Sequence, residues 1–178
     1  KPLISASKDD ITFFDSINYI NDLKITKAKI CITNKNLEKY LSSNLVKIVV
    51  PNVLFELARV IKLIYPYADI DYPDLSLKLP IKSKFKKVKF GNNVLIGKKV
   101  KIGKETVIGT NSIIESNVVI GKKCVIGSGV IIKNSIIGDN VVIQDNSKIG
   151  QKGFGFIPLK NKNIKFPHIG SVLINNNV

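Results

Sequence analysis

Several kinds of residue are scarce in this chain of 178 residues, and each scarcity narrows what it can be. It contains no methionine, and therefore no initiator residue, so we expect an internal piece of a longer protein. No apolar run reaches membrane-spanning length and no secretory signal is visible, which predicts no stable membrane insertion. The two cysteines, Cys31 and Cys124, lie in apolar surroundings, and this favours buried, reduced thiols in a cytoplasmic protein.

Arginine is almost absent, although the net charge is +15. Arg59 is the only arginine, so lysine carries nearly all of the positive charge. Two interpretations stay open: a coding bias that enriches lysine, asparagine and isoleucine, or attraction to acidic partners. Nucleic acid is not expected as a partner, because there is no recognised binding module and no interleaving of arginine with aromatics. The densest basic stretch comprises Lys82, Lys84, Lys86, Lys87 and Lys89.

A six-residue repeat runs through the second half of the chain. Glycine follows eight of its apolar positions, and a small or β-branched residue lies four residues after nine of them. A fixed short period indicates a repeat architecture. The apolar positions are Phe90, Ile96, Ile102, Ile108, Ile114, Ile120, Ile126 and Ile132 and, after a step of five, Ile137, Ile143 and Ile149.

This period predicts a parallel β-helix, because an α-helix requires a period of 3.6 residues. Each unit supplies one short strand and one turn, and three units complete a triangular coil. The repeated apolar residue points inward and stacks on its equivalents, while the glycine relieves crowding at the corner. Lysine, asparagine, aspartate and serine fill most other positions, which predicts solvated outward faces. The step of five shortens one turn without breaking the stack.

The first half of the chain lacks the repeat. Residues 29–33 and 46–50 have the composition of short strands. A helix is predicted over residues 53–64, with Asn52 as its cap, and Pro66 ends it. Its polar stripe consists of Glu56, Arg59 and Lys62.

We therefore expect a mostly β protein with three parts. A small α/β domain occupies residues 1–74 and is incomplete at its start. A basic connecting segment, residues 75–89, covers the first coil and blunts its open edge. The β-helix occupies residues 90–178 and is truncated at its C-terminal end, because residues 174–178 begin a further repeat.

Three stretches give the chain a specific resemblance. They are Asp10 to Tyr19 (DITFFDSINY), ahead of a strand containing Ala28, then Val50 to Ala58 (VPNVLFELA), and Ile149 to Phe156 (IGQKGFGF) with Pro167 to Gly170 (PHIG). In this order, ahead of and within a hexapeptide helix, they resemble the UDP-3-O-acylglucosamine N-acyltransferases of lipid A synthesis. The resemblance implies a left-handed β-helix, an exception to the right-handed crossover rule.

The resemblance also implies an activity. Members of that family are cytoplasmic homotrimers of Gram-negative bacteria. They transfer an (R)-3-hydroxyacyl group from acyl carrier protein to the 2-amine of a UDP-3-O-acylglucosamine, with no metal or organic cofactor. A histidine acts as general base, and backbone N–H groups stabilise the oxyanion.

The resemblance assigns two groups of substrate-binding residues. The N-terminal domain binds uridine: Phe13 and Tyr19 would flank the uracil ring, with Ser16 where the family commonly has asparagine. The excursion comprising Gly153, Phe154, Gly155 and Phe156 would lie near the active-site cleft between subunits, against acyl chain or a neighbouring subunit. Both groups also have a structural interpretation in place of substrate binding. Phe13 and Tyr19 would then pack in the core, and residues 153–156 would form a loop whose aromatic rings pack on each other.

The catalytic histidine is not expected within this chain. His168 is its one histidine, and it occupies a position that carries glutamine in the family. We expect a loop or binding role for His168 and expect the catalytic histidine beyond Val178. The chain as given should therefore bind substrate without catalysis.

Two other functions stay open. One is another hexapeptide transferase, such as a sugar O-acyltransferase or a serine acetyltransferase, against which the motif around Phe13 and Tyr19 argues. The other is a non-catalytic β-helix that acts as a scaffold or binding module. Some such modules bind through ladders of threonine or serine on an outer face, whereas Thr106 and Ser112 are expected to point inward.

Overall fold

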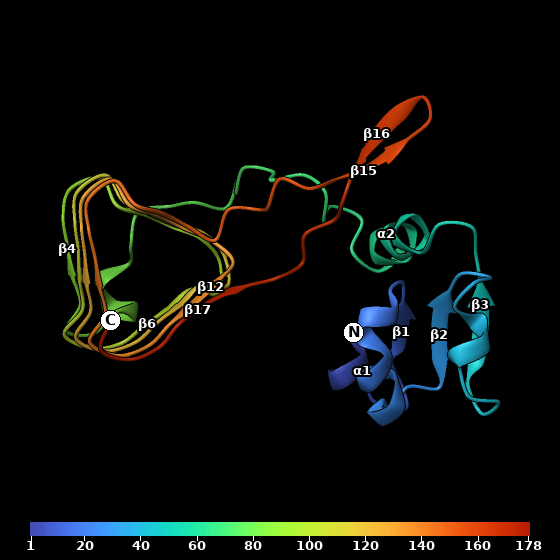
Figure 1. The fold of residues 1–178 in the computed structure, drawn as a ribbon. Helices are drawn as coiled ribbons and strands as arrows, with labels where there is room; N and C mark the ends of the chain where they lie inside the picture. Colours follow the sequence, from blue (N-terminus) through green and yellow to red (C-terminus); the bar gives the residue numbers. More distant parts are fainter. The chain divides into compact units, whose positions relative to one another are not determined.

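The computed structural model describes residues 1–178, and its contacts divide the chain into two compact units. One unit comprises residues 1–69 together with 154–167, and the other comprises residues 70–153 together with 168–178. Both are drawn in Figure 1 and are described separately below. The domain limits expected at residues 74 and 89 stay predictions.

The first unit contains a three-stranded parallel sheet in the order β1-β2-β3. The strands predicted at 29–33 and 46–50 are confirmed as β2 and β3, although β2 begins after Ala28. Neither β1 nor α1 was predicted from the sequence, because both are too short for a periodic pattern. The elements are η1 (Leu3–Ser5), β1 (Ile11–Phe14), η2 (Ile17–Tyr19), α1 (Ile20–Ile25), β2 (Ile30–Thr33), η3 (Glu38–Tyr40), β3 (Val46–Val49) and α2 (Val53–Ile64).

A small apolar core forms on one face of this sheet. Phe14 and Cys31 are fully buried there, packed with Leu3, Leu23 and Leu41. Burial raises the pKa of the Cys31 thiol to about 11, so the group stays protonated at neutral pH. Cys31 and Cys124 are both free and buried, as their apolar surroundings predict.

The helix predicted over residues 53–64 is confirmed as α2. The Asn52 side chain accepts a hydrogen bond from the Phe55 N–H at 3.0 Å, which caps the first turn. Arg59 forms an ion pair with Glu56 on the polar stripe at 2.9 Å. The helix packs against β1 and β2, with Val53 and Ala58 as its buried residues.

The same unit includes an antiparallel hairpin formed by β15 (Phe156–Leu159) and β16 (Lys162–Lys165). The hairpin interrupts the repeat between residues 153 and 168. The whole interruption is called the excursion from here on. Within it, Ile157 is buried and pairs with Ile164.

The second unit is the predicted parallel β-helix, and its stacked coils trace a triangle in Figure 1. Every third strand pairs in parallel, giving three sheets in the orders β4-β7-β10-β13, β5-β8-β11-β14 and β6-β9-β12-β17. This arrangement is consistent with the left-handed form. The strands are β4 (Lys89–Phe90), β5 (Leu95–Ile96), β6 (Lys101–Ile102), β7 (Val107–Ile108), β8 (Ile113–Ile114), β9 (Val119–Ile120), β10 (Val125–Ile126), β11 (Ile131–Ile132), β12 (Ser135–Ile137), β13 (Val142–Ile143), β14 (Lys148–Ile149) and β17 (Val172–Ile174).

The core of the β-helix consists of the residues that the repeat predicts. The second residue of most strands is buried and stacks on its equivalent in the next coil, as Ile108 does on Ile126. Most of the small residues at the corners are buried too. Thr106 and Ser112 point inward as expected, and their hydroxyls donate to the carbonyls of Gly121 (2.9 Å) and Gly127 (2.8 Å).

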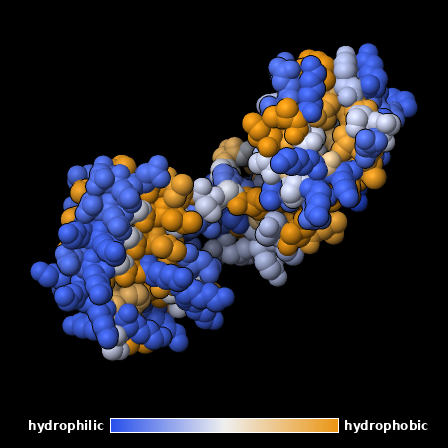
Figure 2. Space-filling model, turned by 90° about the horizontal axis from the view of Figure 1, so that it is seen from below, coloured by the Kyte–Doolittle hydropathy of each residue, from blue (hydrophilic) through white to orange (hydrophobic).

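The expectation of solvated outward faces is wrong for the strands. The residue directly before each inward apolar residue points outward. In most strands this outward residue is apolar, as at Val107, Val125, Ile136, Val142 and Leu173. Figure 2 shows an apolar band on the β-helix between hydrophilic residues. The polar residues of the repeat occupy the turns, because each strand contains only two or three residues.

The turns repeat a left-handed backbone conformation three residues after the inward isoleucine. Asparagine occupies many of these positions, for example Asn111 and Asn117, with φ of 60° and 66°. Asparagine tolerates this region better than most residues. The glycines have a different role: a Cβ on Gly103 would lie 2.5 Å from the backbone of Gly121 in the next coil. The predicted crowding at the corner is therefore confirmed.

The step of five and the excursion leave the stack intact. The shortened turn passes through Asn134, with φ of 45°, and Ile137 still pairs with Ile120. After the excursion the chain returns as β17, which pairs with β12 in the third sheet.

The segment before the first coil covers one edge of it, as the sequence predicts. Lys78 and Ile96 exchange backbone hydrogen bonds across an antiparallel bridge at 2.8 and 3.1 Å. Phe85, just after η4 (Lys82–Lys84), packs against the core and meets Phe90 edge-to-face at 5.6 Å.

Asp74 fixes the same segment to the flank of the β-helix. Its two carboxylate oxygens accept hydrogen bonds from the N–H and hydroxyl groups of Ser76 and Ser116, at 2.6–2.8 Å. Burial raises the pKa of Asp74, but these hydrogen bonds outweigh it and leave the pKa well below its ordinary value.

Replacing Ile137 by alanine should lower the free energy of unfolding by about 2–5 kcal/mol, since it removes a fully buried side chain and leaves a cavity. The neighbouring Ile136 is 50% exposed, so Ile136→Ala is a control of the same size and should cost clearly less. Chemical denaturation followed by circular dichroism measures both. Equal losses would contradict the inward and outward assignment.

Replacing Asp74 by asparagine should make stability less dependent on acid pH. A lowered folded-state pKa adds stability above the unfolded-state pKa, near 3.8, and this stability is lost as the pH falls through the folded-state value. The stability difference between wild type and Asp74→Asn should therefore be largest near neutral pH and narrow below about pH 4. Urea titrations across this range measure it, with the exposed Asp9→Asn as control. A difference that does not change with pH would contradict the role of Asp74.

Candidate functional site

The carboxyl end of β1 carries the N-terminal motif. Phe14 points into the core, so the alternation of the strand places Phe13 on the opposite face, where it is only partly buried. Ser16 directly precedes η2 and caps it: its hydroxyl oxygen accepts a hydrogen bond from the Asn18 N–H at 3.3 Å. Tyr19 ends η2 and is 51% exposed. Neither Phe13 nor Tyr19 belongs to the apolar core of this unit.

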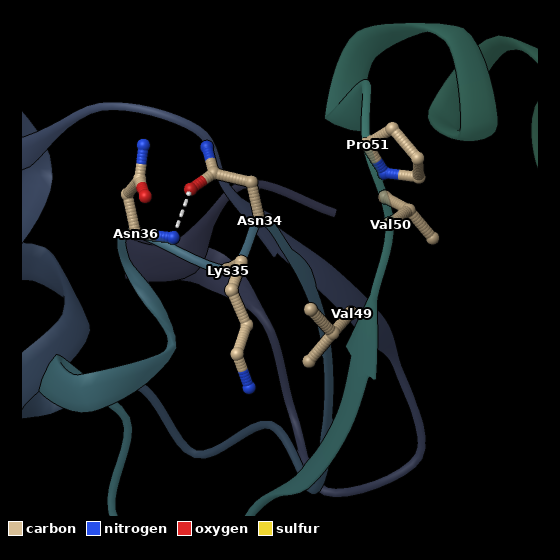
Figure 3. Close-up of a pocket in the computed structure, with 6 residues that line it drawn as sticks. All are labelled: Asn34, Lys35, Asn36, Val49, Val50 and Pro51. Atoms are coloured by element: carbon tan, nitrogen blue, oxygen red, sulfur yellow. Dashed lines mark hydrogen bonds between the residues drawn. The ribbon is translucent and has the colours of Figure 1, made fainter.

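A pocket of about 510 Å³ lies at the carboxyl ends of the neighbouring strands β2 and β3 (Figure 3). The Asn34 side-chain oxygen accepts a hydrogen bond from the Asn36 N–H at 3.0 Å, which shapes the loop on one side. The other side is formed by residues 49–51, immediately before α2. The carboxyl ends of parallel strands are where open α/β sheets place their ligands.

The strand register relates this pocket to the N-terminal motif. Phe14 pairs with Thr33, and Thr33 pairs with Val49. The next residues, Asp15 and Asn34, are therefore neighbours at one edge of the sheet. Asn34, Lys35 and Asn36 were not predicted from the sequence, although an asparagine that directly follows an apolar strand is a turn signal.

The excursion carries the second group of expected residues. Phe154 and Phe156 meet edge-to-face, with ring centroids 4.8 Å apart, and they are 88% and 45% exposed. They pack on each other but leave most of the Phe154 ring uncovered. Gly155 accepts a hydrogen bond from the Phe166 N–H through its carbonyl at 2.8 Å, at the start of the hairpin.

His168 lies at the neck of the excursion. Its Nδ1 atom accepts a hydrogen bond from the Gly153 N–H at 2.8 Å, so the neutral imidazole carries its proton on Nε2. A Cβ added to Gly153 would lie 2.6 Å from the same nitrogen, and only glycine allows this close approach. The geometry thus assigns His168 a structural contact.

The basic cluster expected from the sequence is exposed. Lys82, Lys84, Lys86, Lys87 and Lys89 all lie on the surface between η4 and β4, and no ion pair involves them. Lys84 also lines a second pocket of about 510 Å³, together with Lys78, Lys98 and Lys99. Nothing neutralises this concentration of positive charge within the second unit.

Lys133 supplies a contrasting, paired lysine on the β-helix. Its ammonium group lies 3.2 Å from a carboxylate oxygen of Asp71 and 3.2 Å from one of Glu115. Burial lowers the pKa of Lys133, but these two carboxylates raise it by more, so the ammonium stays charged. We interpret this network as a structural attachment of residue 71 to the flank of the β-helix.

Comparison with known families defines the class of the chain. Residues 87–122 match the family described as bacterial transferase hexapeptide (six repeats), so the β-helix is of the kind found in hexapeptide transferases. Residues 1–63 match the family described as UDP-3-O-(3-hydroxymyristoyl) glucosamine N-acyltransferase, LpxD. The two matches, in this order, support an LpxD-like chain and an acyltransferase of the lipid A pathway. No match was found among curated proteins.

No helix is long and apolar enough to cross a bilayer. No group of three or more histidine, cysteine, aspartate or glutamate side chains is placed to hold a metal ion.

Replacing His168 should weaken the hydrogen bond that the Gly153 N–H donates at the neck of the excursion. The size of the effect should depend on whether the new side chain still offers an acceptor. Leucine removes the acceptor, so the Gly153 amide should exchange with solvent faster in His168→Leu. Asparagine places an oxygen close to the position of Nδ1, so His168→Asn should retain part of the protection. Amide exchange of Gly153 by nuclear magnetic resonance measures this, and equal exchange in wild type and His168→Leu would contradict the contact.

Proposed function

We propose that this chain provides the uridine-binding domain and part of the β-helix of an N-acyltransferase. The reaction transfers an (R)-3-hydroxyacyl group from acyl carrier protein to the 2-amine of UDP-3-O-acylglucosamine in lipid A synthesis. The observation that carries the proposal is the order of two features: an N-terminal unit of the LpxD kind followed by a hexapeptide β-helix.

The N-terminal unit binds the uridine part of the acceptor. Phe13 and Tyr19 offer aromatic faces outside the core, and stacking on such faces is the common way to hold a base. Ser16 stands beside them and offers its hydroxyl to the edge of the base. The neighbouring polar loop at Asn34 and Asn36 is available to the ribose or the phosphates.

The chemistry is attack of an amine on a thioester. The amine nitrogen forms a bond with the acyl carbon, the carbon–sulfur bond breaks, and the thiol leaves on acyl carrier protein. A general base takes the proton from the attacking nitrogen, and N–H groups stabilise the oxyanion. We do not assign the base to His168, because its Nδ1 holds the neck of the excursion. The proposal requires no metal ion or organic cofactor.

The excursion contributes to acyl binding in this proposal. Phe154 is the most exposed aromatic ring described above, and an uncovered ring on a projecting loop is suited to contact an acyl chain or a neighbouring subunit. Gly153 and Gly155 allow the loop to leave the stack, and Phe156 supports the Phe154 ring edge-to-face.

The partners follow from charge and apolar surface. The unpaired lysines at 82–89 favour an acidic partner, which suits acyl carrier protein. Val107, Val125 and Val142 form an exposed apolar ladder in register on one face of the β-helix. Such a face supports packing of identical copies, and we propose a homotrimer in the cytoplasm of a Gram-negative bacterium.

Loss of both aromatic rings should weaken binding of uridine monophosphate by about tenfold or more, since a stacked base contributes about 1–3 kcal/mol. The variant Phe13→Ala with Tyr19→Ala tests this by calorimetric titration. Tyr40→Ala is the control, because Tyr40 is similarly exposed in the same unit.

Unchanged affinity in the double variant would contradict the uridine site and favour another hexapeptide transferase. A scaffold protein should bind no uridine nucleotide at all. The ladder of threonine and serine that some scaffolds use is not favoured here, because Thr106 and Ser112 face inward.

A further inference from the structure

Positive charge is concentrated in one stretch of the chain. Residues 75–104 contain ten lysines and no acidic residue, whereas the rest of the chain contains seventeen lysines, Arg59 and thirteen acidic residues. A coding bias toward lysine does not by itself exclude aspartate and glutamate from one stretch. The stretch supplies ten of the fifteen net positive charges. Its lysines are Lys78, Lys82, Lys84, Lys86, Lys87, Lys89, Lys98, Lys99, Lys101 and Lys104.

The stretch forms one surface at the start of the β-helix. Residues 75–88 precede the first coil, and backbone hydrogen bonds between Lys78 and Ile96 fix them to its edge. Residues 89–104 belong to the first coil, whose strands β4, β5 and β6 are each the outermost strand of a sheet. We call the surface formed by residues 75–104 the basic end.

All ten lysines of the basic end are exposed, and none takes part in an ion pair. Asp74 and Glu105 are the nearest acidic residues in the sequence. The Asp74 carboxylate is occupied by hydrogen bonds from Ser76 and Ser116, and no ion pair involves Glu105. The basic end therefore attracts an anionic partner, and salt should weaken this attraction.

Aliphatic side chains are exposed on the same surface. Leu75 is 94% exposed, Leu79 is 65% exposed and Ile81 is 56% exposed. Leu79 and Ile81 also line the second pocket, which has a volume of about 510 Å³, together with the lysines Lys78, Lys84, Lys98 and Lys99. Apolar surface whose contact with water costs free energy thus lies directly among unpaired ammonium groups.

The composition of the basic end favours a lipid bilayer over an acidic protein as the partner. Protein interfaces are enriched in arginine and aromatic residues and depleted in lysine. The basic end has no arginine, and its two aromatic residues, Phe85 and Phe90, pack against the core of the β-helix. Lysine clusters beside exposed aliphatic side chains suit an anionic bilayer, because the headgroups attract the ammonium groups and the hydrocarbon accepts the aliphatic side chains.

We propose that the basic end docks on the surface of an anionic lipid bilayer. The lysines lie at the level of the lipid phosphates, and Leu75 and Leu79 enter the boundary between headgroups and acyl chains. The contact is peripheral and involves no spanning segment. It goes beyond the proposed function and does not depend on it, since attraction of acyl carrier protein by the lysines at 82–89 would not account for the exposed leucines.

Sedimentation of the full chain with vesicles tests the proposal. The probes are vesicles of phosphatidylcholine alone and vesicles of phosphatidylcholine mixed with phosphatidylglycerol. We expect the chain to bind the anionic vesicles about tenfold or more tightly than the neutral ones, because each lysine near an anionic surface adds to the affinity. Binding to the anionic vesicles should fall as salt is added.

Two triple variants of equal net charge locate the contact. The test variant removes three lysines of the basic end and should bind anionic vesicles about tenfold or more weakly than wild type. The control removes three exposed lysines elsewhere on the β-helix and should lose clearly less. The test variant combines Lys82→Gln, Lys84→Gln and Lys86→Gln, and the control combines Lys122→Gln, Lys123→Gln and Lys148→Gln.

A second pair of variants tests the aliphatic part of the contact. Leu75→Ala should weaken binding to anionic vesicles by about threefold or more, because it removes apolar surface that the bilayer would cover. Leu173→Ala removes a leucine that is 68% exposed outside the basic end, and it should leave the binding unchanged.

Three results would overturn the proposal. One is the absence of binding to anionic vesicles, including the case in which acyl carrier protein binds the basic end instead. Another is an equal loss in the two lysine variants, because net charge alone would then explain the binding. The third is equal binding to neutral and anionic vesicles. Unchanged binding of Leu75→Ala would overturn the insertion of that side chain. Titration of the same samples with uridine monophosphate reports on the proposed function separately.

Discussion

The stacking of inward side chains, one coil upon the next, is the contact on which the second unit depends. Each coil presents one inward apolar side chain from each of three strands, and parallel pairing holds each one over its equivalent. The stack requires backbones to approach closely at the corners. Gly103 and Gly121 allow this approach, because a side chain there would collide with the next coil. The six-residue period of the sequence is the direct consequence of this packing.

The stack of coils is interrupted once by an insertion, the excursion, and continues in register after it. The chain leaves after β14 and returns as β17, which takes the next place in the third sheet beside β12. The Gly153–His168 hydrogen bond closes the neck. The β-helix therefore tolerates the insertion of a hairpin segment with two exposed aromatic rings, and such insertions are common where a repeat scaffold departs from its regular pattern.

The features that could be predicted from the sequence are those that depend on neighbouring residues or on a regular repeat. Local or periodic patterns predicted three features that are confirmed: the β-helix, α2 with its Asn52 cap, and the inward direction of Thr106 and Ser112. The short elements β1 and α1 gave no periodic signal. The apolar outward residues of the strands were not predicted. Polar residues outnumber them at the other positions of the repeat, but those polar residues lie in the turns.

The candidate site was predictable only where it lies in a motif. Phe13, Ser16 and Tyr19 occur together in one stretch, and the structure leaves Phe13 and Tyr19 outside the core. Asn34 and Asn36 join the same edge through the register of a parallel sheet, which local sequence does not reveal.

The central claim is that the first unit holds uridine at the carboxyl edge of its sheet. A crystal structure of the chain with a uridine diphosphate sugar tests it most directly. We expect the uracil ring to lie against Phe13 and Tyr19. A pocket of about 770 Å³ also lies in this unit, lined by Lys24, Lys27 and Lys29 near the amino end of β2. Nucleotide bound there, with the carboxyl edge empty, would contradict the account.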